Sequence, residues 1–256
     1  SKRQRMKRLL VVLMIVTLLV SALSPVVTSA KPITPRVLEA VFIHYEQPAK
    51  GGPPAPAEPK VYDYYLALGP KWDLSKYSTG VPYVINPKGA PAGAAAEVKA
   101  GFEAWDAASS AELFKDNPTT DTNSWWGKLD GKNNVSWQII AGYPNAIAAT
   151  WIWIEDKDNN GIFSAGDEVL ETDIVFNQGN IKWSIDLDGE GTAYKIKTYD
   201  VRNIATHEVG HVVGLDDFYE TKYSEITMYG YSSKGETKKI SLEIGDKNGT
   251  IALYGN

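Results

Sequence analysis

The most constraining feature of the sequence is the stretch ATHEVGHVVGLDDF, residues 205–218, which holds two of the three histidines in the chain. A helix turns once in about 3.6 residues, so His207 and His211 would lie one above the other on the same helical face. Two neutral imidazoles at this spacing can bind one zinc ion. Gly214 follows three residues later and tolerates the left-handed conformation that ends a helix. The stretch therefore predicts a helix that ends beside a metal site.

The third ligand of this site is expected to be a carboxylate. A catalytic zinc ion commonly takes three protein ligands and leaves one position for water. The remaining histidine, His44, lies far upstream and before a predicted linker. Asp217 comes six residues after His211, beyond the glycine turn, and Asp216 is the neighbouring alternative. We expect Asp217, because it matches the position that a returning chain would present.

Glu208 is predicted to be the catalytic residue. On a helical wheel it lies among Val201, Ala205 and Val212, where an ionised carboxylate is costly without a partner. Water activated by a zinc ion is such a partner, because zinc lowers the pKa of water to about 7. Glu208 would accept the proton of that water and later donate it to the leaving amine. The pattern H-E-x-x-H also occurs on ordinary helices, but Gly214, the following aspartates and the scarcity of other histidines favour a metal site.

A second metal loop is predicted over DKDNNGIFSAGDEV, residues 156–169. Hard oxygen ligands alternate around Gly161, which stands where an EF-hand-like calcium loop turns sharply. The predicted calcium ligands are Asp156, Asp158, Asn160, the Ile162 carbonyl and Asp167. Asp167 stands where such loops have a bidentate glutamate, and Glu168 is adjacent. The alternative is a polar hairpin that needs these residues only for its turn.

The first 30 residues are predicted to be a signal peptide. Five basic residues come first, and an apolar run from Leu9 to Leu23 and the small-residue stretch SPVVTSAK follow. This order matches a secretory signal with cleavage after Ala30. An uncleaved membrane anchor is the alternative, although the apolar run is short for a membrane span. We expect a secreted protein without membrane contact after cleavage, or a cell-surface protein if the segment is retained.

Charge and cysteine content exclude some classes of function. Loss of residues 1–30 would remove five basic and no acidic residues, which takes the formal net charge from −5 to −10. Such a chain is a poor candidate for binding nucleic acids. It has no cysteine, so its stability must come from core packing, bound metal or both. These features do not set an oligomeric state.

The order of the predicted elements indicates an α+β fold. Residues 31–60 are expected to be an N-terminal tail and a linker rich in Pro, Gly and Ala, and the domain is expected to run from Val61 to residue 256. Strands are predicted over 81–87, 134–140, 148–154 and 172–177. Helices are predicted over 94–109, 200–214 and 241–254. Strands grouped around one early and one late long helix are typical of α+β domains.

HEVGHVVGLDD resembles the extended zinc motif of the metzincin metallopeptidases, with Asp in the last place as in snapalysin-type members. EITMYGYSS, residues 225–233, is similar to the Met-turn of that family, which would place Met228 beneath the metal. Its MYGY is closest to the form found in matrixins, although Gly230 stands where matrixins usually have Pro. EVKAGFEAWDAAS, YDVRNIATHEVGH and DKNGTIALYG resemble further matrixin segments.

This resemblance implies a zinc endopeptidase with a twisted, five-stranded mixed sheet, two long helices and a C-terminal helix. One antiparallel edge strand, for which 146–152 is the candidate, would line the cleft, and a peptide substrate would add to it as an extra strand. Matrixins commonly have His as third ligand and a propeptide that carries a cysteine. Because this chain has Asp217 and no cysteine, any latency must work differently.

Two matters stay open at this point. Tyr229 or Tyr231 is a possible hydrogen-bond donor to a tetrahedral oxyanion, although such a tyrosine more often packs against the wall of a cleft. The alternative function is a non-catalytic, secreted protein that binds metal or glycan on the same fold. Glu208 argues against that alternative, because retention of a metal does not require this residue.

Overall fold

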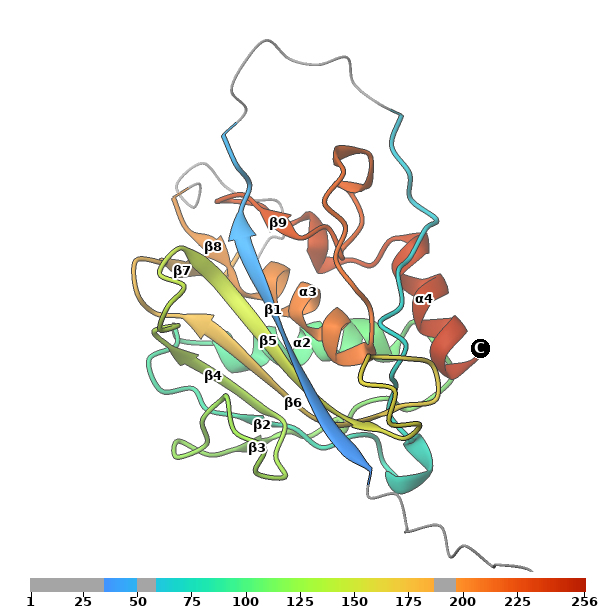
Figure 1. The fold of residues 1–256 in the computed structure, drawn as a ribbon. Coiled ribbons are helices and arrows are strands. Elements are labelled where there is room, and N and C mark those ends of the chain that lie inside the picture. Colours follow the sequence, from blue (N-terminus) through green and yellow to red (C-terminus); the bar gives the residue numbers. More distant parts are fainter. Residues whose placement is uncertain (1–34, 50–58, 187–196) are drawn as a thin grey trace, which may run out of the picture. The chain divides into compact units, whose positions relative to one another are not determined.

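The central element of the structure is a mixed sheet of seven strands in the order β3-β2-β4-β6-β5-β1-β9 (Figure 1). The computed structural model describes residues 35–49, 59–186 and 197–256, and the predicted signal peptide and most of the linker lie outside these ranges. The strands are β1 (Arg36–Glu46), β2 (Val84–Ile85), β3 (Thr119–Thr120), β4 (Asn134–Gln138), β5 (Ala146–Asp156), β6 (Glu168–Asn177) and β9 (Tyr231–Ser232). A separate two-stranded sheet pairs β7 (Trp183–Ser184) with β8 (Tyr199–Asp200).

The three predicted helices are present as α2 (Ala94–Asp106), α3 (Val201–Val213) and α4 (Ile244–Tyr254). Within the described ranges, the short 3-10 helices η1 (Leu74–Lys76), η3 (Thr221–Tyr223) and η4 (Lys238–Ile240) lie in the connections. Helix α3 contacts both α2 and β5, and the indole N–H of Trp105 on α2 donates to the Thr206 carbonyl at 2.7 Å. The α+β class is therefore confirmed. Among the described residues, no helix has the length and apolarity needed to cross a membrane.

The sheet contains the expected five strands and two more. Strands β3, β2, β4 and β6 pair in parallel, and β5 pairs with β6 in the antiparallel direction. Residues 146–152, the candidate edge strand, begin β5, but the other side of β5 is paired with β1. Strand β1 in turn pairs in parallel with β9 at Tyr45 and Glu46. The predicted edge is thus covered by residues of the same chain.

Strand β1 comes from the segment that was expected to be an N-terminal tail. Its residues alternate in exposure, with Leu38, Ala40, Phe42 and His44 more buried than their neighbours Val37, Glu39 and Val41. Leu38 and Phe42 pack against the hydrophobic core. This period of two is that of a strand with one covered face. Arg36 at its beginning pairs with Asp156 at 2.9 Å.

Both ends of α3 are fixed by local contacts. The Asp200 side chain caps the beginning by accepting from the Asn203 N–H at 2.8 Å. At the other end Gly214 has φ 110° and donates to the carbonyls of Gly210 and His211. This left-handed residue reverses the chain, so that Asp217 returns toward the helix.

We predict that Gly214→Ala lowers the free energy of unfolding more than Gly166→Ala does. Both glycines have positive φ, 110° and 104°, so both replacements introduce left-handed strain of about 1–2 kcal/mol. A Cβ atom at Gly214 would also lie 2.9 Å from the Pro70 carbonyl oxygen, whereas no atom lies within 4 Å of a Cβ atom at Gly166. Urea unfolding of the metal-free proteins measures the difference. Equal unfolding free energies would show that Pro70 does not constrain this turn.

Candidate metal centre

Helix α3 presents two imidazoles whose protonation is set by backbone carbonyls. His207 Nδ1 lies 2.7 Å from the Thr227 carbonyl oxygen, and His211 Nδ1 lies 2.9 Å from the Leu215 carbonyl oxygen. A carbonyl oxygen only accepts, so each Nδ1 carries a proton and donates it. The Nε2 atom of each ring is therefore left with a free lone pair. Bare imidazole nitrogens held in this way are typical of metal ligands.

Asp217 completes the cluster. Its Oδ1 atom lies 3.3 Å from His207 Nε2 and 3.6 Å from His211 Nε2. The alternative residue, Asp216, is only partly buried and uses its side chain to accept from the Asp217 N–H at 2.8 Å. The structure thus brings His207, His211 and Asp217 together and leaves Asp216 outside the cluster.

The cluster fits a cation. Among the described residues, His207 Nε2 and Asp217 Oδ1 are buried without any hydrogen-bond partner. Burial lowers the pKa of His207 to about 4, so this ring is neutral at neutral pH and does not balance the carboxylate. Burial opposes ionisation of Asp217, but the adjacent histidines and the Tyr219 hydroxyl outweigh it and hold its pKa at about 2. An anionic oxygen beside two bare nitrogens matches the donor set of zinc.

Glu208 lies beside the cluster with one oxygen fixed and one free. Its Oε2 atom accepts from the Thr150 hydroxyl at 2.6 Å, whereas Oε1 is buried without a partner among the described residues. Burial raises the pKa of Glu208 to about 8, although the Thr150 hydrogen bond acts in the opposite direction. A carboxyl with a raised pKa and a free oxygen near a metal site can exchange protons at neutral pH.

His44 is the residue of this site that sequence reasoning missed. It lies on β1, with its ring 4.0 Å from the His207 ring and its Nδ1 atom 3.6 Å from Glu208 Oε1. Phe42, two residues earlier, stacks on the His211 ring at 4.4 Å. The alternation of side chains along residues 36–46 was an available signal, but nothing local indicates which strand these residues pair with.

Met228 lies directly under the helix that carries the histidines. It is buried, and a Cβ atom at Gly210 would collide with its sulfur. Gly210 is therefore the residue of α3 that allows this approach. The turn is held by Asp246 of α4, whose carboxylate accepts from the N–H groups of Thr227 and Met228 at 3.0 and 3.3 Å. The sequence analysis did not single out Asp246.

The tyrosine that contacts the cluster is Tyr219. Its hydroxyl donates to Asp217 Oδ2 at 3.0 Å, and its ring would collide with a Cβ atom at Gly230. Tyr229 is buried and Tyr231 partly buried, and their carbonyls accept from the Lys239 ammonium. The oxyanion role of these two tyrosines stays a prediction.

The acidic loop after β5 forms a second cluster. Carboxylate oxygens of Asp156, Asp158 and Asp167 lie within 4.8 Å of one another. Asn160 donates its side-chain N–H to Asp158 at 2.8 Å, and Ile162 has its side chain exposed. Arg36 contacts Asp156 Oδ2 at 2.9 Å, so one of these carboxylates already has a cationic partner. The binding of calcium stays a prediction.

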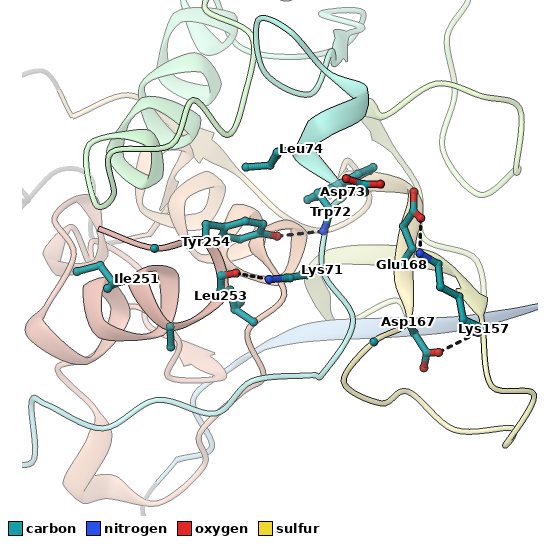
Figure 2. A pocket seen from close by; sticks show the side chains of 13 residues that line it. Lys71, Trp72, Asp73, Leu74, Lys157, Asp167, Glu168, Ile251, Leu253 and Tyr254 are labelled. Atoms are coloured by element: carbon teal, nitrogen blue, oxygen red, sulfur yellow. Dashed lines mark hydrogen bonds and ion pairs between the residues drawn. The ribbon is translucent and has the colours of Figure 1, made fainter.

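A further pocket, drawn in Figure 2, has a volume of about 630 Å³. It is lined by Lys71 and Trp72, by Asp167 and Glu168, and by the end of α4. Lys157 pairs there with Glu168 at 2.8 Å. Because its lining includes none of His207, His211 and Asp217, this cavity does not give access to the candidate metal centre.

Comparison with known proteins identifies a family match that includes the candidate metal centre. The family model described as Matrixin matches residues 93–255. The chain is 33% identical over 73 residues to Metalloendoproteinase 4-MMP of Arabidopsis thaliana, which covers 28% of this chain and 19% of the relative. It is 34% identical over 73 residues to Metalloendoproteinase 1-MMP of the same organism, which covers 28% of this chain and 18% of the relative. The matched part thus spans about a fifth of the length of each relative.

We predict that Tyr219→Phe weakens zinc binding by about 10- to 100-fold, because the hydrogen bond that orients the Asp217 carboxylate is lost. Tyr223→Phe is the control, since that ring packs on Phe218 nearby without a contact to Asp217. Competition with a chromophoric chelator measures both affinities. Equal affinities in the two variants would show that Tyr219 does not orient this ligand.

Proposed function

The chain belongs to the matrixin family, and we propose that it is a zinc-dependent endopeptidase. The observation that carries the proposal is the cluster of His207, His211 and Asp217 beside Glu208, in which His207 Nε2, Asp217 Oδ1 and Glu208 Oε1 are buried without a hydrogen-bond partner among the described residues. Metal retention by itself accounts for the first three residues. The buried acid beside them is the group that hydrolysis requires.

In this proposal His207, His211 and Asp217 would hold the zinc ion, and Met228 packs against Gly210 of the helix that carries the two histidines. Zinc at this place supplies a Lewis acid and lowers the pKa of water. Glu208 takes a proton from the attacking water and delivers it to the amine that leaves. Thr150 keeps the Glu208 carboxylate in position through its hydrogen bond to Oε2.

The expected substrate is an extended peptide. Strand β5 offers its outer edge to β1 over ten residue pairs from Arg36 to Tyr45, so this edge accepts an antiparallel strand beside Glu208. A peptide that replaced β1 would gain the same backbone hydrogen bonds. The adjacent cluster would then lie next to the backbone of that peptide.

We also propose that the protein is secreted. The support is the order of basic, apolar and small residues over 1–30, which is typical of a cleavable signal. Mass spectrometry of the exported protein should find an N-terminus at Lys31. A chain that keeps residues 9–23 in the membrane fraction would support the anchored alternative.

We predict that Glu208→Gln lowers the rate of hydrolysis of a quenched peptide by about 100-fold or more, because the amide cannot accept the proton of the attacking water. Since β1 covers this residue, the rates are compared in the wild-type chain and in a Leu38→Asp background. In that background a carboxylate on the core-facing side of β1 weakens its packing. Zinc content is measured in parallel by elemental analysis.

Three results bear on this proposal. Loss of hydrolysis with chelator and its return with added zinc would support it. Full activity in Glu208→Gln, or activity that chelator does not affect, would contradict the mechanism. A chain that retains zinc but hydrolyses no peptide in either background would favour the non-catalytic alternative.

The acidic loop over 156–167 is proposed to bind calcium and to stabilise the domain. Its support is the close approach of the Asp156, Asp158 and Asp167 carboxylates, which are oxygen ligands of the kind that calcium prefers. We predict that calcium raises the melting temperature of the wild type but not of Asp158→Ala. Asp116→Ala, which removes an exposed carboxylate elsewhere, should respond to calcium as the wild type does. Wild-type melting that is identical with and without calcium would remove the proposal.

A further inference from the structure

The candidate metal centre is closed. His207, Glu208 and His211 are fully buried or nearly so, and Asp217 is buried as well. Much of this cover comes from β1, since Phe42 stacks on the His211 ring and His44 meets the His207 ring edge-on. A peptidase site has to admit a peptide bond, so the proposed function requires β1 to leave.

The pairing of β1 puts it in the place that a peptide would take. It runs antiparallel to β5 from Arg36 to Tyr45 and parallel to β9 at Tyr45 and Glu46. Phe42 lies opposite Thr150, the residue that holds the Glu208 carboxylate. The backbone groups that would bind an extended substrate are therefore occupied by the chain itself.

A hydrogen-bond network fixes how His44 faces the site. Its Nε2 atom lies 2.9 Å from Ser232 Oγ. That hydroxyl also accepts from the Lys239 ammonium at 2.9 Å and donates to Glu236 Oε1 at 3.3 Å. Because the one hydroxyl proton goes to the carboxylate, His44 Nε2 must donate to Ser232. The Nδ1 atom is then bare and buried, has no hydrogen-bond partner in the part of the chain that the structure describes, and lies 3.6 Å from the free Oε1 of Glu208.

Two lone pairs that face each other in a buried space are unfavourable unless a proton or a cation lies between them. Nδ1 of His44 and Oε1 of Glu208 are such a pair, and His207 belongs to the same cluster. The imidazole of His44 thus stands where substrate or solvent would approach Glu208.

We propose that residues 36–46 are an internal inhibitor of this chain, in which β1 occupies the substrate edge of β5 and His44 fills the approach to Glu208 and the metal. This inference rests on the proposed function and adds its regulation. It gives a cysteine-free chain a means of latency that depends on an imidazole. The strand is held at its two ends by the ion pairs Arg36–Asp156 and Glu46–Lys234, each 2.9 Å long.

Binding of acetohydroxamic acid to the zinc-loaded, full-length chain tests the proposal without any need for turnover. His44→Ala opens the approach to the metal, and Leu38→Asp places a charge on the core-facing side of β1, away from the metal cluster. Both variants should bind the hydroxamate at least about tenfold more tightly than the wild type. A chain closed by β1 does not bind the hydroxamate, so the apparent affinity of the wild type is lowered in proportion to the small fraction of chains that are open. Isothermal titration calorimetry measures the affinities, and hydrolysis of a quenched peptide should rise in the same variants.

Val37→Asp is the matched control, because it adds the same charge one residue earlier on the opposite face, where Val37 is 47% exposed. It should bind the hydroxamate as the wild type does. Unchanged affinity in both His44→Ala and Leu38→Asp would overturn the proposal, and so would an equal rise in Val37→Asp. Loss of zinc and a large fall in melting temperature in Leu38→Asp would also overturn it, because β1 would then be a permanent part of the fold.

The same measurements separate this proposal from the proposed function. If hydroxamate binding rises in the variants while no protein hydrolyses the peptide, the peptidase assignment fails and the closure by β1 stands. If the wild type and both variants hydrolyse the peptide at one rate and bind the hydroxamate equally, the peptidase assignment stands and the inhibitory role of β1 fails.

Discussion

Two backbone carbonyls decide what the centre can bind, because each accepts a hydrogen bond from the Nδ1–H of one imidazole and leaves the opposite nitrogen bare. The carbonyl of Leu215 belongs to the turn after Gly214, and that of Thr227 immediately precedes Met228. The reversal of the chain and the turn beneath the helix therefore act on the ligands themselves as well as on the packing. Loss of either contact would allow the other tautomer and turn a metal ligand into a hydrogen-bond donor.

The departures from the usual matrixin pattern depend on one another in space. A carboxylate at Asp217 is shorter than an imidazole, and the Tyr219 hydroxyl fixes the oxygen that does not face the histidines. The Tyr219 ring occupies the space that any Cβ atom at Gly230 would enter. Replacing the usual proline by glycine thus makes room for the tyrosine that orients the aspartate. Asp217 and Tyr219 precede η3 and Gly230 follows it, so only the structure shows that these three residues are in contact.

Sequence reasoning succeeded where the determinants are local. The spacing of His207 and His211, the positive φ of Gly214 and the return of Asp217 all lie within eleven residues of chain, and the structure brings these side chains together. The prediction from sequence was incomplete where a residue of the site comes from a distant part of the chain. His44 is 163 residues before His207, and a strand of ordinary apolar alternation does not specify its partner. The Pro-, Gly- and Ala-rich linker that follows His44 made an N-terminal tail and linker the simpler expectation for residues 31–60.

Strand β1 also contributes to the electrostatics of Glu208, the proposed catalytic residue. Burial is the main cause of the raised pKa of Glu208, and β1 contributes to that burial through His44 and Phe42. A sheet edge with free N–H and C=O groups invites any extended chain to pair with it. Residues 36–46 belong to the same chain as β5, so they are always present at a high effective concentration beside this edge. Under the proposed function, a substrate for this edge would compete with an intramolecular strand, and the stability of the β1–β5 pairing would set how often Glu208 is accessible.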